Sequence, residues 1–374
     1  MFLLFPSLFL AIYSICSGVL PLKVSWLWKA VLSLIILAIA LKYQAYSIGG
    51  GTFFEPFVKG KALLIYEALY GALVVLTALL FFKDVCSLAL WLLKKWGVSV
   101  GFSFNNNTML AVLMAVSAAA GFWGMWEATR VPEVRAVTLK VKGLPDAWKG
   151  TKIVQLSDLH IGPVQGAEWL SEVVKKTNAL HPDMVLITGD FIDGSVPKTL
   201  FKLEPLKELK TKYGVYAIPG NHEYYSGYAN WMKALSQLGL NMLQNQSAVL
   251  KKNEAALIVG GTTDLGASRF GLEGPDLKKT FAGTPENATR ILLTHQPKTT
   301  SGSSERVDLQ LSGHTHGGHI FFMYPILAYF NDGMVSGAYQ RSDKLVYVNR
   351  GTGLWNGFSI RIGVPSEITD ITLE

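Results

Sequence analysis

The stretch LSGHTHGGHI, residues 311–320, holds three of the seven histidines of the chain within six residues. It follows an apolar run and gives way to glycines. Imidazoles at such spacing are either metal ligands or a local accident of a loop. The polar residues elsewhere in the chain decide between these two interpretations.

Five short apolar runs in the second half of the sequence each end in polar groups. Between the first two runs, apolar residues recur at helical spacing from Trp169 to Leu180, which predicts a strand, a helix and a strand in order. In such sheets ligands gather beyond the carboxyl ends of the strands, where each run delivers its polar residues. The runs are Lys152–His160, Asp183–Asp193, Gly214–Glu223, Arg290–Pro297 and Val307–Gly318.

The groups delivered there form a ligand set for transition metals. Carboxylates, imidazoles and one amide suit Mn, Fe or Zn, and they do not suit Ca or copper–thiolate chemistry. One ion is saturated by four to six such groups, so the surplus predicts two ions roughly 3.5–4 Å apart. A single D-x-H pair is a weak signal, but the whole ordered set predicts a built site. The set comprises Asp158, His160, Asp190, Asn221, His222, His295, His314 and His316.

The order of these motifs resembles the calcineurin-like metallophosphoesterase superfamily. The resemblance covers about Lys152 to the C-terminus, with D-x-H, G-D-x-x-D, G-N-H-E, a lone histidine and G-H-x-H in sequence. The final run YVNRGTG…FSIRIGVPSEITDITL and the apolar N-terminal half further resemble a bacterial membrane-bound branch of that superfamily. Some members of that branch, or of neighbouring ones, act on cell-envelope lipids such as UDP-2,3-diacylglucosamine.

The resemblance implies two divalent ions, with Mn expected first and Fe or Zn as alternatives. A hydroxide bridging the two ions would attack a phosphoester or pyrophosphate bond. Asp190 would bridge the ions. The first ion would be held by Asp158, His160, Asp190 and His316, and the second by Asp190, Asn221, His295 and His314.

Further residues of the motifs receive supporting roles from the same resemblance. His222 would donate a proton to the leaving oxygen or stabilise the transition state. We expect Glu223 to orient His222, and Asp193 to hydrogen-bond to a metal-ligand histidine. His319 departs from the pattern, since relatives commonly carry glutamine there; it is either a substrate contact or a solvated loop histidine.

The N-terminal part is dominated by apolar runs of membrane-spanning length. Four runs predict four transmembrane helices, and we interpret Asp84–Gly97 as an amphipathic segment at the interface. Glu67 lies inside the third run, where a carboxyl group is either functional or faces the bundle interior. The four runs are Phe2–Val19, Trp26–Leu41, Ala62–Phe82 and Met109–Trp126.

Charge separates the two parts of the chain. Up to Arg130 there are nine Lys/Arg against four Asp/Glu, and the remainder has twenty-five against twenty-three. The basic excess therefore accompanies the apolar runs, which favours membrane lipids as partners and argues against nucleic acid. Cys16 and Cys86 suggest neither a disulfide framework nor a thiolate metal site. The Lys/Arg distribution at the span ends favours a cytoplasmic C-terminal domain, in a bacterial inner (plasma) membrane if the resemblance to the bacterial branch holds.

These observations predict a transmembrane helical domain over 1–130, a linker with a first strand over 131–149 and a catalytic domain over 150–374. The bare sequence supports an α/β fold, and the resemblance implies a four-layer αββα sandwich of two mixed sheets. We expect a membrane-anchored phosphohydrolase with a phosphorylated or pyrophosphate-containing, lipid-linked substrate. The alternatives are an anchored phosphodiesterase for soluble nucleotides and a non-catalytic scaffold of the same fold. The sequence does not indicate the oligomeric state.

Overall fold

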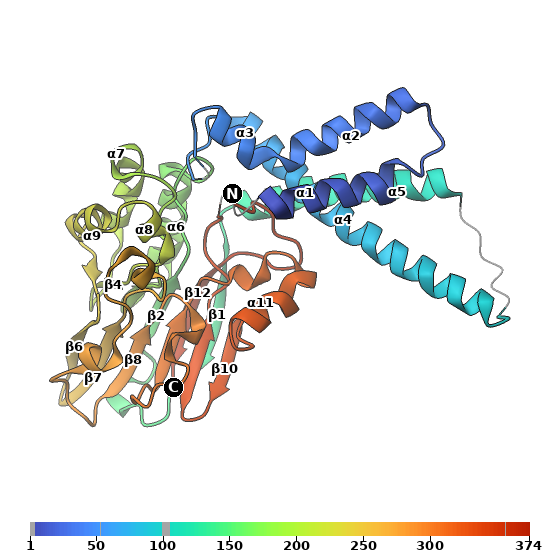
Figure 1. Ribbon diagram of the computed structural model, residues 1–374. Coiled ribbons are helices and arrows are strands. Elements are labelled where there is room, and N and C mark those ends of the chain that lie inside the picture. Colours follow the sequence, from blue (N-terminus) through green and yellow to red (C-terminus); the bar gives the residue numbers. More distant parts are fainter. Residues whose placement is uncertain (1–3, 53, 99–104, 356) are drawn as a thin grey trace. The chain divides into compact units, whose positions relative to one another are not determined.

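A computed structural model describes residues 4–52, 54–98, 105–355 and 357–374 of the chain (Figure 1). The chain divides into two compact units. The first unit comprises Met1–Glu127 together with Gly357–Ile360, and the second comprises Ala128–Asn356 together with Arg361–Glu374.

The first unit is helical. Among the described residues, α4 and α5 are long and apolar enough to cross a membrane, and α2 and α3 together form a third candidate span with a bend of 67°. The helices are α1 (Leu4–Ser14), continued by a π-helical turn η1 (Ile15–Val19), α2 (Trp26–Ala40), α3 (Lys42–Ile48), α4 (Gly60–Lys95) and α5 (Asn106–Thr129).

The predicted number of four spans is therefore too high for the described residues. The helix that covers Leu4–Val19 has a length of about 24 Å, which is less than the roughly 30 Å of a hydrocarbon core. Residues 2 and 3 of the predicted first run lie outside the described residues. The count from the sequence treated every apolar run as one straight span, whereas the structure has one short helix and one bent pair.

The predicted interfacial segment Asp84–Gly97 is also wrong as a separate element, because α4 continues through it to Lys95. No glycine or proline interrupts the chain between Phe82 and Lys95. The first glycine after that stretch is Gly97, with a φ of 82°, and it terminates the helix in the left-handed conformation that glycine adopts without cost.

Glu67 faces the interior of the helical unit. Its carboxylate accepts from Lys42 Nζ at 2.5 Å and from the Tyr46 hydroxyl at 2.8 Å, and all three side chains are buried. A buried carboxylate requires such partners, because an unpaired charge in an apolar phase is strongly unfavourable. The bundle-facing interpretation of Glu67 is thereby confirmed.

The second unit contains two six-stranded mixed sheets. The first has the order β1-β12-β2-β3-β4-β5, and in it β2, β3, β4 and β5 run parallel while β12 is antiparallel to β2. Its strands are β1 (Glu133–Leu139), β2 (Lys152–Leu156), β3 (Met184–Ile187), β4 (Val215–Ala217), β5 (Asn241–Met242) and β12 (Glu367–Leu373).

The second sheet has the order β10-β11-β9-β8-β7-β6, with β11, β9, β8 and β7 parallel and an antiparallel strand at each edge. Its strands are β6 (Gln246–Lys252), β7 (Ala255–Gly261), β8 (Thr289–Leu293), β9 (Leu309–Ser312), β10 (Gly337–Arg341) and β11 (Lys344–Val348).

The two sheets pack face to face. Alternate side chains of each strand point to opposite faces of its sheet, so one set fills the core between the sheets and the other faces the outer helices. Ile153 of β2 lies in the core between the sheets with Ile291 of β8, whereas the adjacent Val154 packs under the outer helices. Helices α6 (Ala167–Ala179) and α9 (Tyr228–Gln237) cover the outer face of the first sheet, and α10 (Leu277–Phe281) covers the second. The α/β fold with two mixed sheets is confirmed, including the predicted unit of β2, α6 and β3.

Shorter helical elements connect these layers. They are α7 (Val196–Thr199), α8 (Asn221–Tyr225), α11 (Tyr324–Phe330) and the turns η2 (Asp146–Trp148), η3 (Leu200–Glu208), η4 (Ala267–Phe270), η5 (Pro297–Thr300), η6 (His316–Gly318) and η7 (Phe321–Met323).

Candidate metal centre

The turns that follow the parallel strands carry the candidate ligands. The turn after β2 meets the turn after β3, where the Asp158 N–H donates to the Gly189 carbonyl at 2.9 Å. In the second sheet, the Gly313 N–H after β9 donates to the His295 carbonyl after β8 at 3.0 Å. The topology thus brings segments more than 150 residues apart together at one end of the two sheets.

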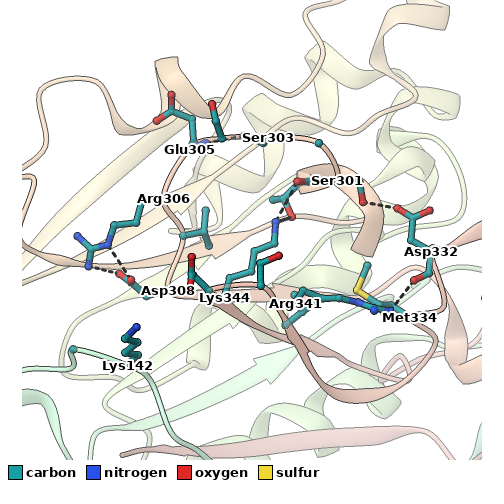
Figure 2. A pocket seen from close by; sticks show the side chains of 18 residues that line it. Lys142, Ser301, Ser303, Glu305, Arg306, Asp308, Asp332, Met334, Arg341 and Lys344 are labelled. Carbon is teal, nitrogen blue, oxygen red and sulfur yellow. Dashed lines mark hydrogen bonds and ion pairs between the residues drawn. The ribbon is translucent and has the colours of Figure 1, made fainter.

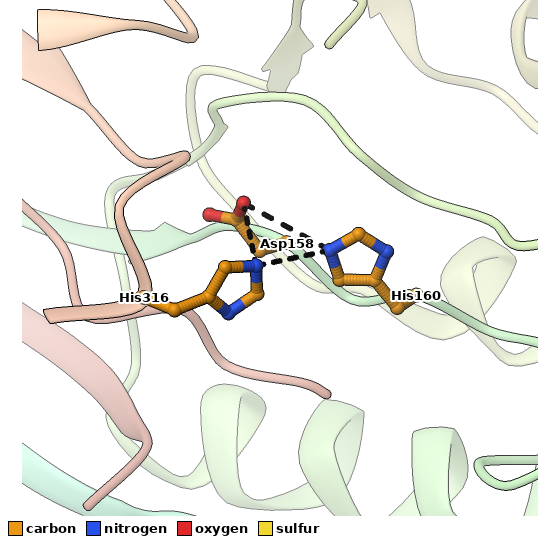
Figure 3. Close-up of side chains that lie close together, drawn as sticks. All are labelled: Asp158, His160 and His316. Atoms are coloured by element: carbon orange, nitrogen blue, oxygen red, sulfur yellow. Dashed lines mark hydrogen bonds and ion pairs between the residues drawn. The ribbon is translucent and has the colours of Figure 1, made fainter. Parts of the chain in front are cut away.

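Asp158, His160 and His316 form a first buried cluster (Figure 3). Nε2 of His160 lies 3.2 Å from Nε2 of His316, and Oδ1 of Asp158 lies 3.5 Å from Nε2 of His316. The His314 N–H donates to the Asp158 carboxylate at 3.1 Å, and so does the Ser157 hydroxyl at 2.5 Å. One oxygen and two nitrogens therefore converge on a common point.

Asp190, His295 and His314 form a second cluster, to which Asn221 contributes its amide oxygen. Nε2 of His295 lies 3.2 Å from Oδ2 of Asp190, 3.2 Å from Nδ1 of His314 and 3.1 Å from Oδ1 of Asn221. Nδ1 of His295 donates to the Thr188 carbonyl at 2.7 Å, which fixes the ring and turns Nε2 toward the cluster.

Asp190 lies between the two clusters. Its Oδ2, which is 3.2 Å from His295 in the second cluster, is also 3.7 Å from Nε2 of His160 in the first. Its Oδ1 accepts from the His222 N–H at 2.9 Å, so the carboxylate is held by the backbone of the third motif. Asp190 is grouped with His295 and His314, and its Oδ2 also faces the His160 ring of the first cluster.

The spacing of these atoms fits divalent cations. Ligand atoms at about 2.1 Å from one ion lie roughly 3.0–3.4 Å from each other in octahedral or tetrahedral geometry. The closest pairs, at 3.1–3.2 Å, match this spacing, and the longer 3.5–4.0 Å pairs require only a small contraction. Nitrogen and oxygen donors without a thiolate suit Mn, Fe or Zn.

Asp193 contacts two histidines at once. Its Oδ1 accepts from Nδ1 of His160 at 3.2 Å and from Nδ1 of His222 at 2.6 Å. The Glu223 carboxylate instead accepts the backbone N–H groups of Asp190 at 3.1 Å and Gly220 at 2.7 Å. We expected Glu223 to orient His222, but the structure gives Asp193 as the carboxylate on the His222 ring, while Glu223 holds the turns.

His319 is mostly buried, with 8% of its surface exposed, so the expectation of a solvated loop histidine is wrong. Its ring stacks on His316 with centroids 4.6 Å apart and lies 6.3 Å from the Trp355 ring. It therefore borders the first cluster, but it is in none of the groups of described residues that could hold a metal ion.

Arg361 is a functional candidate that the sequence reasoning missed. Its side chain is fully buried, and its Nη2 lies 3.3 Å from Nδ1 of His316. The guanidinium also donates to the carbonyl oxygens of His316, Val364 and Gly353 at 3.0–3.3 Å. The only signal in the sequence is an arginine between two isoleucines, where an exposed charge is not expected.

The backbone at the site is strained. Six of its residues have a positive φ, between 46° and 71°, although none of them is glycine. Such a conformation costs roughly 1–2 kcal/mol for a residue with a side chain, and it concentrates at functional sites. The six are Asp158, His160, Asp190, His314, His316 and His319.

Burial and the neighbouring charges shift the pKa values of the site in opposite directions. Burial opposes protonation of His295 and His222, but the Asp190 carboxylate outweighs it, so the pKa of His295 lies well above its ordinary value and the pKa of His222 rises to about 9. Burial and the neighbouring His295 lower the pKa of His314 to about 4. The Asp190 carboxyl keeps a pKa well below its ordinary value despite burial, because His295 and His222 stabilise its charge.

A hollow of about 1040 Å³ lies away from these clusters, between the Thr300–Asp308 loop and the β10–β11 turn (Figure 2). Two of its basic groups have partners. Arg306 pairs with Asp308 at 2.8 Å, and Arg341 donates to the Asp332 carbonyl at 2.8 Å. None of the candidate metal ligands lines it, so size alone does not mark the reactive site.

Comparison with known proteins decides the family. The family model of the calcineurin-like phosphoesterases matches residues 151–318, which include every candidate ligand. The transmembrane protein with metallophosphoesterase domain of Bos taurus is 32% identical over 338 residues, or 86% of this chain and 75% of that protein. The chain belongs to the calcineurin-like phosphoesterase family. The expected resemblance is confirmed.

Relatives of this metallophosphoesterase occur in animals and in bacteria. The protein of the same name from Danio rerio is 34% identical over 282 residues, covering 73% of this chain and 63% of that protein. The uncharacterized metallophosphoesterase YkuE of Bacillus subtilis (strain 168) is 30% identical over 270 residues, covering 70% of this chain and 92% of that protein. The chain thus spans less than two thirds of the Danio rerio relative's length. The names of the vertebrate relatives and the two apolar helices α4 and α5 indicate membrane association.

Proposed function

We propose that the chain is a membrane-anchored hydrolase of phosphoester or pyrophosphate bonds that works with two divalent ions, Mn being the first candidate. The observation that carries the proposal is the position of Asp190, whose Oδ2 faces His160 of one cluster and His295 of the other. A carboxylate shared by two convergent ligand sets is the arrangement that a two-metal site requires.

The candidate ligands would divide between the two ions. Two bound divalent ions would supply Lewis acidity, which neutralises charge on the phosphoryl oxygens and activates water. Asp190 would serve both ions. The first ion would be held by Asp158, His160, Asp190 and His316, and the second by Asp190, Asn221, His295 and His314.

His222 would supply the proton for the leaving oxygen. It belongs to neither ligand set, and the carboxylates beside it favour its protonated form. Asp193 accepts from His222 Nδ1, so the proton on Nε2 is the one that faces the site. Because Asp193 also holds His160, it keeps the proton donor and a metal ligand in a fixed relation.

We propose a lipid-linked or membrane-proximal substrate, such as UDP-2,3-diacylglucosamine. Anchoring through α4 and α5 would raise the concentration of the site near such a substrate. Lys59, Lys61 and Arg130 lie at the start of α4 and the end of α5, whereas Lys94 and Lys95 lie at the end of α4. This distribution favours a cytoplasmic catalytic unit. The membrane would be the inner (plasma) membrane if the source is bacterial.

The test is Mn-dependent hydrolysis by the detergent-purified full chain. UDP-2,3-diacylglucosamine and the generic diester bis-p-nitrophenyl phosphate are compared, with products identified by mass spectrometry. Asp190→Asn should abolish turnover and reduce bound Mn, while Asp146→Asn, the same change at an exposed site, should do neither.

Each outcome separates the candidate functions. Hydrolysis of the diester without the lipid would keep the two-metal enzyme and discard this substrate, and hydrolysis of soluble nucleotides would then favour the anchored phosphodiesterase. No hydrolysis of any substrate by a protein that binds Mn would favour the non-catalytic scaffold.

A further inference from the structure

The segment Phe321–Phe330, which forms η7 and α11, belongs to the second unit and contains no charged residue; α11 is labelled in Figure 1. None of the residues of these two elements is buried. The exposed fraction of its large exposed side chains ranges from 37% for Phe322 to 83% for Tyr329. The large exposed side chains are Phe321, Phe322, Tyr324, Ile326, Tyr329 and Phe330.

The composition of this apolar segment is unusual for a water-facing helix. No Asp, Glu, Lys or Arg occurs between Asp308 and Asp332. A helix on the surface of a soluble protein normally turns a polar face to water, and a helix that is apolar on every side is covered by protein or lipid. A contiguous apolar patch of this kind marks an interaction site.

The apolar segment is held in place by contacts at both ends, so its exposure is not that of a loose loop. The Phe321 N–H donates to the Ile362 carbonyl at 3.1 Å, and the Tyr324 hydroxyl lies 3.2 Å from the Tyr339 hydroxyl of β10. At the other end, Lys298 Nζ donates to the Phe330 carbonyl at 3.1 Å. The fold therefore displays these side chains in a fixed orientation.

We propose that the apolar segment lies in the interfacial layer of a lipid bilayer. The same chain carries α4 and α5, which are apolar enough to cross a membrane, so a bilayer is the apolar phase to which this unit is tethered. Ten helical residues extend about 15 Å, half of a hydrocarbon core of roughly 30 Å, and so the segment lies on the membrane and does not span it.

The residue types agree with an interfacial position. Tyr324 and Tyr329 combine an apolar ring with a hydroxyl, which is the character of residues at the level of lipid headgroups. The Lys298 ammonium at the end of α11 suits anionic headgroups, and there are no acidic side chains within the segment to repel them.

The proximity of the metal centre gives the contact a consequence. Phe321 follows His316 by five residues, and η6, which starts at His316, packs against both η7 and α11. Insertion of the apolar segment would therefore hold the ligand-bearing turn at headgroup depth. Resting on the proposed function, this favours substrates whose phosphate belongs to a lipid headgroup and reaches the site from the bilayer.

The test uses the full chain in vesicles of phosphatidylethanolamine and phosphatidylglycerol. Cys16→Ser and Cys86→Ser remove the native thiols, and Tyr329→Cys receives an NBD fluorophore. Ser303→Cys, in an exposed polar loop, is the matched control. Lipid-borne doxyl groups should quench the dye at position 329 and not at 303, and iodide should quench position 329 at least about threefold less than 303.

Two results would overturn the inference. Equal iodide quenching at both positions would place the segment in water. Protection from iodide without doxyl quenching would show that protein covers it, whether a second copy or the chain's own helices. Neither readout needs turnover, so a protein that fails to hydrolyse any phosphoester can still pass this test, and an active one can fail it.

Discussion

The guanidinium of Arg361 lies 3.3 Å from Nδ1 of the His316 imidazole and donates to the carbonyl oxygen of the same residue at 3.1 Å. One buried cation thus contacts both the ring and the main chain of a candidate metal ligand. Further bonds to the carbonyls of Gly353 and Val364 connect that ligand to the turns beside it. Arg361 therefore acts as a positioning residue, because it contacts the candidate ligand His316 and is not itself a candidate ligand.

Arg361→Gln should weaken metal binding and lower stability together. The buried carbonyls would lose their charged donor, at a cost of about 2–4 kcal/mol in unfolding free energy. Loss of a group that orients a ligand lowers metal affinity by roughly 10–100-fold. Chelator competition with Mn measures the affinity. Arg361→Lys keeps the charge without the planar guanidinium, so its Mn affinity should lie between those of the wild type and Arg361→Gln. Unchanged Mn affinity in both variants would show that the contact is only structural.

Gly313→Ala should impair the first ion site without removing a ligand. An added Cβ would lie 1.9 Å from Ser157 Oγ and 2.3 Å from Asp158 Oδ2, so the Asp158 carboxylate must move. We expect loss of at least one Mn per chain in metal analysis, with activity reduced by about 100-fold. Gly274→Ala is the control, since its Cβ meets no atom within 4 Å. Full Mn content in Gly313→Ala would contradict the role of Asp158.

His222→Asn should slow the release of poor leaving groups most. Removal of a general acid costs about 10²–10⁴-fold in kcat. An alkyl phosphodiester needs the proton, whereas a p-nitrophenyl ester does not, so the loss should be much smaller for the latter. An equal loss on both substrates would remove His222 from the proton-donor role.

The pH dependence of the same reaction gives a second test of His222. If His222 is the proton donor, its protonated form is the active one. Asp190 and Asp193 raise its pKa to about 9, so activity should fall as pH rises through that pKa. Bound cations would lower this pKa by repelling the imidazolium, which moves the falling limb below 9. The limb should disappear in His222→Asn and persist in Asp146→Asn, as measured by kcat profiles.

Metal binding should release protons at neutral pH. The Asp190 carboxylate holds the pKa of His295 well above its ordinary value, so the metal-free protein carries a proton that an ion must displace. His314, with a pKa lowered to about 4, is already neutral and contributes no proton. Calorimetry of Mn binding in buffers of different ionisation enthalpy should show at least about one proton released per chain, and affinity should fall as pH decreases. Binding independent of pH between 6 and 8 would contradict this.

The sequence predicted those features that depend on local pattern. The apolar periodicity around Val173 gave a helix between two parallel strands, and polar residues at strand ends, such as Asp190 and His295, indicated a shared site because parallel strands end at one edge. The identities and order of the motifs were enough to identify the family.

The remaining features depend on tertiary contacts that no local pattern contains. Arg361 meets His316 across 45 residues, and Asp193 meets both His160 and His222 only after three turns assemble. The positive φ at His160 is held by its surroundings, since such a backbone is uncommon for any residue with a side chain. The bend between α2 and α3 was not predicted, because the hydropathy of a run indicates the length of an apolar segment and not whether the helix bends.

The segment Gly357–Ile360 belongs with the first unit, although the chain on both sides of it belongs with the second. Within the first unit, the Tyr43 hydroxyl donates to the Gly357 carbonyl, and Ile360 packs where a Cβ on Gly71 would stand, 2.7 Å from its Cδ1. The chain therefore leaves the second unit at Gly357 and returns to it after Ile360, so a single linker does not connect the two units. A polypeptide starting at residue 128 would lack the helices against which Gly357–Ile360 packs. This segment ends directly before Arg361. We expect such a truncated protein to be less soluble than the whole chain and to lose metal first at His316.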